Sequence, residues 1–289
     1  MVSGTQELTR VSDIPNSAQM VVLRPAKGWL GIDLKELWFY RELIYFLTWR
    51  DIKVRYKQAV LGVAWAVLQP VLTTAVTSVV FGVLLKVKSD GLPYPVFVLA
   101  ALLPWHLFQN SLQKSSVSLV GNANLITKVY FPRVIIPLSS VLAVLVDFVI
   151  SLVLLFIAMA IYRQPVTLKA LWLIPLTLLA VLAALAVGLW LSALNVQYRD
   201  VQQIVPFLVQ IWMYASPIVY PISTIPEGTL RSLYSLNPMV GVVQGFRWAL
   251  FGGTPPDFTL IISSAAALLL LVSGLFFFRR MEKTFADVV

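Results

Sequence analysis

The stretch Trp49–Pro70, WRDIKVRYKQAVLGVAWAVLQP, passes from a dense group of charges into a long uncharged run without any linker. The charged residues of its first part are Arg50, Asp51, Lys53, Arg55 and Lys57. After them no charged side chain occurs before Lys86. Roughly 20 apolar residues of helix cross the hydrocarbon core of a bilayer. The run therefore predicts a membrane span that begins directly after a basic patch.

The composition of the whole chain indicates a polytopic membrane protein. Hydrophobic residues make up 59% of the 289 residues and charged residues only 12%, whereas a soluble domain carries about 25% charged residues. The absence of cysteine excludes disulfides, thiolate chemistry and Cys-ligated metals, and one histidine, His106, does not make a metal site alone. We interpret the net charge of +9 as a record of membrane topology rather than of nucleic-acid binding.

Six segments are long and apolar enough to be predicted as spans. They are Gln58–Leu85, Leu92–Gln113, Val134–Tyr162, Ala170–Val196, Val201–Tyr220 and Phe258–Phe278. With both termini assigned to the cytoplasm, 16 of the 22 Lys and Arg residues fall inside, as the positive-inside rule requires. Residues 1–32 are then expected to be a flexible cytoplasmic tail without a signal peptide, residues 58–280 the six-span domain, and residues 281–289 a second cytoplasmic tail.

Residues 33–57 are predicted to form an amphipathic interface helix followed by a basic anchor. Asp33 and Glu36 have the spacing of a capping-box variant. The apolar residues that share one helical arc are Trp38, Phe39, Tyr40, Leu43, Ile44, Phe46 and Leu47, and Arg41, Glu42 and Thr48 lie opposite them. Such a helix lies in the membrane surface. It serves either as a simple anchor or as a docking surface for a cytoplasmic partner.

The fifth predicted span ends in YASPIVYP, Tyr214–Pro221. Pro217 and Pro221 each lack a backbone donor and should break the helix near the outer face. Met239–Phe251, which follows Pro238, is apolar but too short to span, and such a stretch is more often re-entrant or interfacial. Arg247 within it argues against deep burial in lipid. We therefore predict that the loop between spans five and six dips back as an external gate.

Several functions are disfavoured by what the sequence lacks. Asp147 is the one charged residue well inside a span, and a helix-packing or dimer hydrogen bond is as probable for it as a functional role. An ion-coupled carrier normally needs several such groups. There is no G-x-x-x-x-G-K-[ST] motif, so the chain is not expected to hydrolyse ATP. A glycosyltransferase is disfavoured because Asp200, Glu227 and Asp257 are scattered rather than paired.

Aromatic and amide side chains concentrate in spans one, two and five. They are Trp65, Gln69, Trp105, Phe108, Gln109, Asn110, Tyr198, Gln202, Gln203, Gln210, Trp212, Tyr214 and Tyr220. Interfacial belts and core packing account for many of them. Amides inside membrane segments nevertheless need partners, and aromatic faces mixed with amides suit the apolar C–H faces and hydroxyl rims of a sugar chain. The set is therefore a candidate glycan pathway.

Three separate stretches resemble one known family. They are RELIYFLTWRDIKVRYKQAVLGVAWAVLQPVLTTAVTSVVFG (Arg41–Gly82), KVYFPRVIIPLSSVLAVLVDF (Lys128–Phe148) and NVQYRDVQQIVPFLVQIWMYASPIVYP (Asn195–Pro221). In register over roughly Leu37–Met281, the chain resembles the permease subunits of polysaccharide-exporting ABC transporters. These belong to the ABC-2 superfamily and include O-antigen (Wzm-like), capsule and teichoic-acid exporters.

The resemblance implies an all-α integral membrane protein with six transmembrane helices, an interface helix and re-entrant gate helices. It implies a homodimer in the bacterial inner membrane, joined by two copies of a separate ATPase subunit that binds ATP and Mg, with no cofactor in the permease itself. By analogy, the helix Leu34–Thr48 and the loop Ser115–Pro132 would receive the ATPase stroke. The residues expected to couple there are Arg41, Glu42, Asn124 and Lys128.

From the aromatic and amide set, the residues predicted to form the glycan pathway are Trp65, Gln69, Trp105, Phe108, Gln109, Gln210, Trp212, Tyr214 and Tyr220. The external gate would comprise Pro217, Pro221, Pro238 and Arg247. The basic anchor, Arg50, Lys53, Arg55 and Lys57, would meet the anionic pyrophosphate of a lipid-linked glycan. The sequence thus predicts the permease subunit of an O-antigen-type polysaccharide exporter. The alternatives are another ABC-2 cargo, such as teichoic acid, capsule, lipid or a drug, or a secondary carrier.

Overall fold

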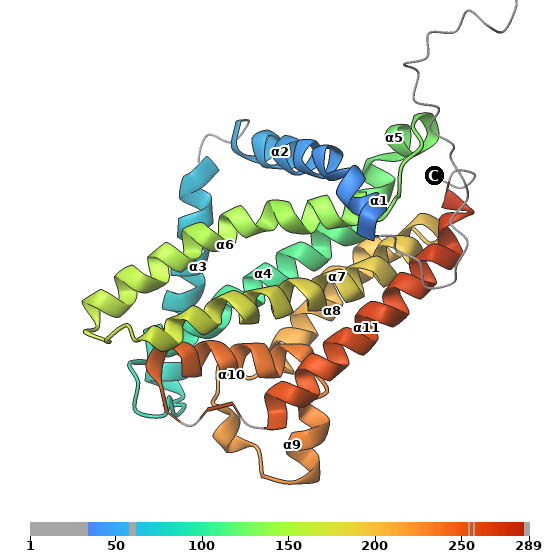
Figure 1. The fold of residues 1–289 in the computed structure, drawn as a ribbon. Coiled ribbons are helices and arrows are strands. Elements are labelled where there is room, and N and C mark those ends of the chain that lie inside the picture. The colour runs from blue at the N-terminus through green and yellow to red at the C-terminus, as the bar shows by residue number, and fades with distance from the viewer. Residues whose placement is uncertain (1–33, 58–61, 254, 257, 286–289) are drawn as a thin grey trace, which may run out of the picture. The chain divides into compact units, whose positions relative to one another are not determined.

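The computed structural model describes residues 34–57, 62–253, 255–256 and 258–285, which fold as helices joined by loops, with no strand among them. The predicted amino-terminal tail and Asp33 of the capping-box variant lie outside the described residues. Figure 1 shows the arrangement. The helices are α1 Leu34–Phe39, α2 Arg41–Lys57, α3 Gly62–Thr77, the π-helical η2 Ser78–Leu84, α4 Tyr94–Gly121, α5 Ala123–Lys128, α6 Ile135–Ile161, the 3₁₀ turn η3 Leu168–Trp172, α7 Leu173–Gln197, α8 Val201–Tyr214, the 3₁₀ turn η4 Ile222–Thr224, α9 Thr229–Tyr234, α10 Pro238–Phe251 and α11 Phe258–Glu282.

Four stretches of the described chain are long and apolar enough to cross a membrane. They are Ala64–Leu84, Ile135–Ile161, Leu168–Gln197 and Phe258–Glu282. They coincide with the first, third, fourth and sixth predicted spans. The all-helical, multi-pass class expected from the sequence is therefore confirmed.

The fifth predicted span is shorter as a helix than the sequence indicated. α8 ends at Tyr214, six positions before the predicted end at Tyr220. Pro217 explains this early end, because proline disfavours helical conformation in the residue before it and cannot donate to the preceding turn. With 14 residues, α8 is about 21 Å long, less than the roughly 30 Å hydrocarbon core.

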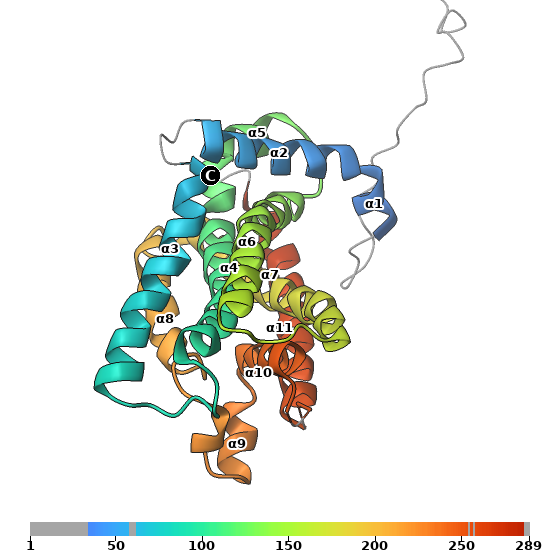
Figure 2. The ribbon, with the colours of Figure 1, turned by 90° about the vertical axis from the view of Figure 1, so that its left-hand side faces the viewer.

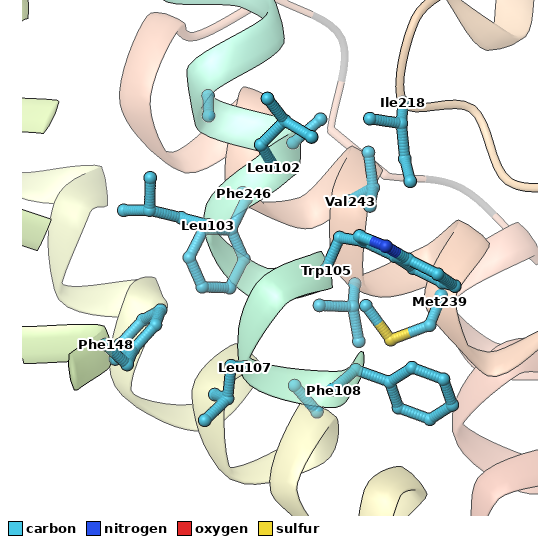
Figure 3. Close-up of a cluster of buried hydrophobic side chains, with 14 of the residues drawn as sticks. Leu102, Leu103, Trp105, Leu107, Phe108, Phe148, Ile218, Met239, Val243 and Phe246 are labelled. Carbon is cyan, nitrogen blue, oxygen red and sulfur yellow. The ribbon is translucent and has the colours of Figure 1, made fainter. Parts of the chain in front are cut away.

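α4 lies at the centre of the bundle and packs against α3, α6, α7, α8 and α10. Its helix continues through Pro104. The contact with α7 is close because Gly188 has no side chain: a Cβ there would lie 2.5 Å from Ser115 Oγ. Small residues permit such close approach between membrane helices. Figure 3 shows the surrounding core, in which Trp105 and Phe108 of α4 pack near Val243 and Met239 of α10.

α1, α2 and α5 lie at one end of the bundle, here called the α2 end, and α9 lies at the opposite end, here called the α9 end (Figures 1 and 2). A second hydrophobic cluster joins the helices at the α2 end. It contains Leu47 of α2, Leu119 of α4, Ile126 of α5, Ile135 of α6, Ala193 of α7 and Phe278 of α11. The predicted docking helix and the predicted docking loop therefore rest on the same packed base.

The predicted interface helix differs in two ways from the structure. It is broken at Tyr40 into α1 and α2, and its apolar residues do not share one face. Leu47 is buried, whereas Phe39 and Phe46 are 68% and 63% exposed. The protein core takes part of the apolar arc, and the rest points away from the bundle. Helical periodicity groups apolar residues on one arc of a helix. It does not show which of them pack in the protein core and which face the surroundings.

Candidate functional site

A cavity of ≈ 270 Å³ lies where the last turn of α2 meets α3, α4 and α6. Trp65 and Gln69, two of the residues predicted to contact a glycan, line it from α3, and His106 and Asn110 line it from α4. α6 contributes apolar wall and one carboxylate, Asp147. The cavity thus combines an indole, two amides and an imidazole with apolar surface, the mixture that binding sites for neutral polar ligands use.

Asp147 is held by two side chains from the last turn of α2. The Arg55 guanidinium donates to one carboxylate oxygen and the Tyr56 hydroxyl to the other. The Arg55 and Asp147 side chains are only 25% and 21% exposed. Burial lowers the pKa of Arg55, an effect opposed by the neighbouring Tyr56 and Asp51, and burial raises the pKa of Tyr56. Asp147 therefore makes a contact between α2 and α6 within this chain.

Ion pairs reduce the number of basic-anchor residues whose charge is available to bind an anion. The charge of Arg55 is balanced by Asp147, and Arg50 Nη2 lies 2.8 Å from Asp51 Oδ1. Within the described part of the chain, Lys53 and Lys57 form no ion pair. The two lysines are therefore the predicted anchor residues whose charge is left for a lipid headgroup.

His106 has no hydrogen-bond partner among the described residues. Both of its ring nitrogens are buried. Buried polar atoms generally require partners, and His106 lines the cavity.

The other predicted pathway residues of α4 lie in the core. Trp105 and Phe108 are fully buried, with Trp105 Nε1 donating to Gln109 Oε1 at 2.9 Å. The Phe108 ring contacts the Trp212 ring edge to face, with centroids 5.0 Å apart. In this subunit these side chains act as packing groups, and Trp65 and Gln69 are the pathway candidates that border an open cavity.

The predicted residues near the end of α8 form a different group. Gln210 and Tyr214 are exposed on α8, which also exposes Ile204, Phe207, Leu208 and Ile211. The Tyr220 side chain is held in place by two hydrogen bonds. Its hydroxyl lies 3.0 Å from the Tyr214 carbonyl oxygen and 2.8 Å from the Tyr234 hydroxyl. Burial, together with this bond, raises the pKa of Tyr234.

The predicted gate residues lie together at the α9 end. Arg247 of α10 donates to the carbonyl oxygens of Pro217 and Ile218, each at 2.7 Å, and to those of Tyr220 and Phe97 at 3.4 Å. Its guanidinium carbon is 3.6 Å from the centroid of the Phe97 ring. The cation therefore holds the non-helical segment that follows α8 against α4 and α10.

Asn237 supports the same segment from the start of α10. Its side-chain oxygen accepts from Met239 N at 3.0 Å and from Trp212 Nε1 at 2.9 Å. Its amide nitrogen donates to Ser216 Oγ at 2.9 Å. Asn237 caps α10, and Pro238 occupies the first turn, where a missing N–H costs nothing. The other gate prolines, Pro217 and Pro221, are buried beside it.

The sequence analysis missed Asn237 as a gate residue, although a signal was present. Asn followed by Pro before an apolar run is a helix start signal. Tyr94 was missed as well: its hydroxyl donates to the Val219 carbonyl oxygen at 2.7 Å. No local pattern indicates that contact, because the two residues are 125 positions apart.

The residues predicted to couple to an ATPase are all exposed at the α2 end. Arg41 and Glu42 begin α2, and Asn124 and Lys128 belong to α5. Arg41 lies over the Trp38 ring, with its guanidinium carbon 5.4 Å from the centroid. These four side chains are available to a partner, and the helices that carry them share the cluster at the α2 end.

Comparison with known proteins gives a consistent family assignment. Residues 42–251 match the ABC-2 type transporter family. The chain is 34% identical over 225 residues to the O-antigen export system permease protein RfbA of Myxococcus xanthus, covering 78% of this chain and 86% of the relative. It is 30% identical over 227 residues, with the same coverage, to an RfbA of Klebsiella pneumoniae. It is 25% identical over 210 residues to the polysialic acid transport protein KpsM of Escherichia coli, covering 71% of this chain and 79% of the relative.

Proposed function

The chain belongs to the ABC-2 type transporter family, and we propose that it is the permease subunit of an ATP-driven exporter of a lipid-linked, O-antigen-type polysaccharide. The observation that carries the proposal is the similarity to O-antigen export permeases over 78% of the chain. The cavity bordered by Trp65 and Gln69 supports it, since an aromatic face beside amides suits a sugar.

In this proposal the subunit crosses the bacterial inner membrane six times, with both termini in the cytoplasm. α4 and α8 supply the second and fifth crossings in addition to the four apolar spans. α8 is short for a crossing, and the segment up to Tyr220 completes it. Non-helical backbone survives at membrane depth when it is packed in protein, and the bonds from Arg247 and Asn237 provide that packing.

The ATPase is proposed to bind at the α2 end. A permease that lacks nucleotide-binding motifs needs a separate subunit to hydrolyse ATP and bind Mg. Exposed charges on α2 and α5 offer a docking surface, and the hydrophobic cluster beneath gives that surface a rigid base. Lys53 and Lys57 are proposed to attract the pyrophosphate of the cargo lipid near this end.

The permease is proposed to work as a homodimer with two ATPase subunits. α3 and α8 both carry exposed apolar side chains, including Leu72 and Val76 on α3 and Phe207 and Ile211 on α8. Two-fold symmetry is the commonest form of homo-oligomer, and we propose that part of these faces pairs with the second subunit while the rest contacts lipid. Tyr214 and Gln210, exposed on α8, would then face the space between subunits, and the α9 end would form the external gate.

The test is complementation of a bacterial strain whose O-antigen export permease has been deleted. The chain is supplied together with the ATPase subunit of an O-antigen exporter, and surface polysaccharide is measured. We expect export to be restored and to require a catalytically competent ATPase. Restored export with an inactive ATPase, or no export from correctly inserted protein, would refute the proposal.

The pathway is tested in the same cells with Trp65→Ala, Gln69→Ala and Tyr214→Ala, singly and combined. Each stacking contact contributes about 0.5–1.5 kcal/mol, so single variants should slow export partially and the triple variant should nearly stop it. ATP turnover of the purified complex should persist. Phe258→Ala is the control, because Phe258 is also an exposed aromatic residue, at 64%, and does not line the cavity.

A further inference from the structure

The contact of Arg55 and Tyr56 with Asp147 joins two parts of the subunit with different tasks. Arg55 and Tyr56 lie in the last turn of α2, whose first turn carries the proposed ATPase-docking residues. Asp147 lies near the middle of α6, one of the four apolar spans. α2 packs along α6 in both views of the fold (Figures 1 and 2). The contact is therefore a polar link between the docking helix and a membrane-spanning helix.

The same contact forms part of the cavity wall. Arg55, Tyr56 and Asp147 line the cavity together with Trp65 of α3 and His106 of α4. A movement of α2 must either carry α6 with it or separate the charges of Arg55 and Asp147. Separation in a setting that excludes most water is costly, because each charge loses its partner without full hydration. The less costly response is that α6, and with it one wall of the cavity, follows α2.

The acidic residue near Arg55 on its own helix also acts on the charge of Arg55, but it is already bonded to another arginine. Asp51, on the same helix, is engaged by Arg50 at 2.8 Å. Among the described residues, Asp147 is the only acidic group to pair with Arg55. Ser151 Oγ donates to the Asp147 backbone carbonyl at 2.9 Å and does not compete for the carboxylate. Loss of Arg55 or of Asp147 thus leaves the other without a charged partner.

We propose that Arg55, Tyr56 and Asp147 form a mechanical joint that transmits displacement of the ATPase-docking helix to α6 and so to the wall of the cavity. The three are positioning residues for transport and need not bind cargo. The inference rests on the proposed function, since it requires an ATPase that moves α2. It also replaces the role predicted for Arg55 as a free binding group for pyrophosphate.

The first experiment measures export and ATP hydrolysis together for Arg55→Gln, Asp147→Asn and the charge swap Arg55→Asp with Asp147→Arg. We expect each single variant to insert and bind the ATPase, to keep ATP turnover, and to lower surface polysaccharide per inserted molecule by about tenfold. The swap should recover a substantial part of that export. Lys88→Gln, which removes an exposed cation from a loop at the α9 end, should export as the parent does.

Two results would overturn the inference. One is parental export per inserted molecule in either single variant, which would make the pair a merely structural contact. The other is a swap that exports no better than the single variants although it inserts and assembles. Failure of the parent chain to restore export in the deletion strain would instead refute the proposed function, so the two failures are distinguishable.

The second experiment measures the distance between α2 and α6 directly. The chain has no cysteine, so spin labels can be placed specifically at Val54→Cys on α2 and Val149→Cys on α6, which are 55% and 56% exposed. In the permease–ATPase complex, the distance within one subunit should stay constant between nucleotide-free and ATP-trapped states. In the Asp147→Asn background it should change or broaden between those states. A distance that changes in the parent would overturn the inference.

Discussion

Two partly buried arginines at opposite ends of the bundle are stabilised in different ways. Arg55, at the α2 end, is balanced by the carboxylate of Asp147 on another helix. Arg247, at the α9 end, is held by the carbonyl oxygens of Pro217, Ile218, Tyr220 and Phe97 and pairs with no carboxylate among the described residues. The first arginine binds a side chain and the second binds backbone.

This difference leads to a separate expectation for each end of the bundle. An ion pair links two helices through one pair of side chains. It therefore either transmits a displacement of one helix to the other or breaks. Carbonyl oxygens from several positions fix the path of the chain itself, and Arg247 then becomes part of the local backbone structure. We therefore expect substitutions at the α9 end to affect folding and substitutions at the α2 end to affect coupling.

The largest effect is expected for Arg247→Gln. Each buried carbonyl left without a donor costs about 1–3 kcal/mol, so losing the bonds to Pro217 and Ile218 should lower the free energy of unfolding by about 2–6 kcal/mol. Thermal denaturation of the purified protein in detergent, and the yield of inserted protein, measure this. Arg163→Gln, which removes an exposed cation from another loop, should leave both unchanged. Normal stability of Arg247→Gln would mean that the carbonyl contacts are incidental.

A smaller effect is expected for Asn237→Ala. The side chain supplies a helix cap, worth about 1 kcal/mol, and bonds to Trp212 and Ser216 worth about 0.5–1.5 kcal/mol each, so the loss should be about 2–4 kcal/mol in the same assay. Asn237→Asp keeps the acceptor for Met239 N and Trp212 Nε1 and should recover about half of it. If Asn237→Asp were as damaging as Asn237→Ala, the donor bond to Ser216 would carry the effect.

The smallest effect on stability is expected for Tyr56→Phe. It removes one hydrogen bond to the Asp147 carboxylate, about 1.5–3 kcal/mol, and leaves the Arg55–Asp147 pair in place. Export should fall less than in Asp147→Asn, with ATP turnover unchanged. Tyr45→Phe, on an exposed ring of the same helix, controls for the substitution. A Tyr56→Phe defect equal to that of Asp147→Asn would show that the hydroxyl, rather than the charge pair, makes the joint.

The sequence predicted the fold class well because membrane spans have a strong local signal. The uncharged run after Lys57 and the apolar stretches that became α6, α7 and α11 are long enough to identify one by one. The break after α8 was also predictable, since Pro217 acts on its own neighbours. The divided apolar surface of α1 and α2 was not, because helical periodicity identifies an apolar face without identifying what covers it.

The candidate site was less predictable, because its residues meet from distant positions. Trp65 and Gln69 were selected as residue types suited to sugars, and so were Trp105 and Phe108, yet the former line a cavity and the latter fill the core. Composition does not separate these outcomes. Burial depends on which face of α4 meets α8 and α10, and that is settled by packing between helices.

The sequence by itself determined that this chain enters a membrane, where its principal apolar spans lie, and to which transporter family it belongs, because these properties depend on local hydrophobicity and on similarity along the chain. The tertiary structure alone decided that Asp147 pairs with Arg55 and Tyr56, and that Arg247 binds the backbone beyond α8. A polar group within an apolar span must find a partner, but its position in the sequence does not say which one. The folding of α2 over α6 and of α10 beside α8 makes that choice.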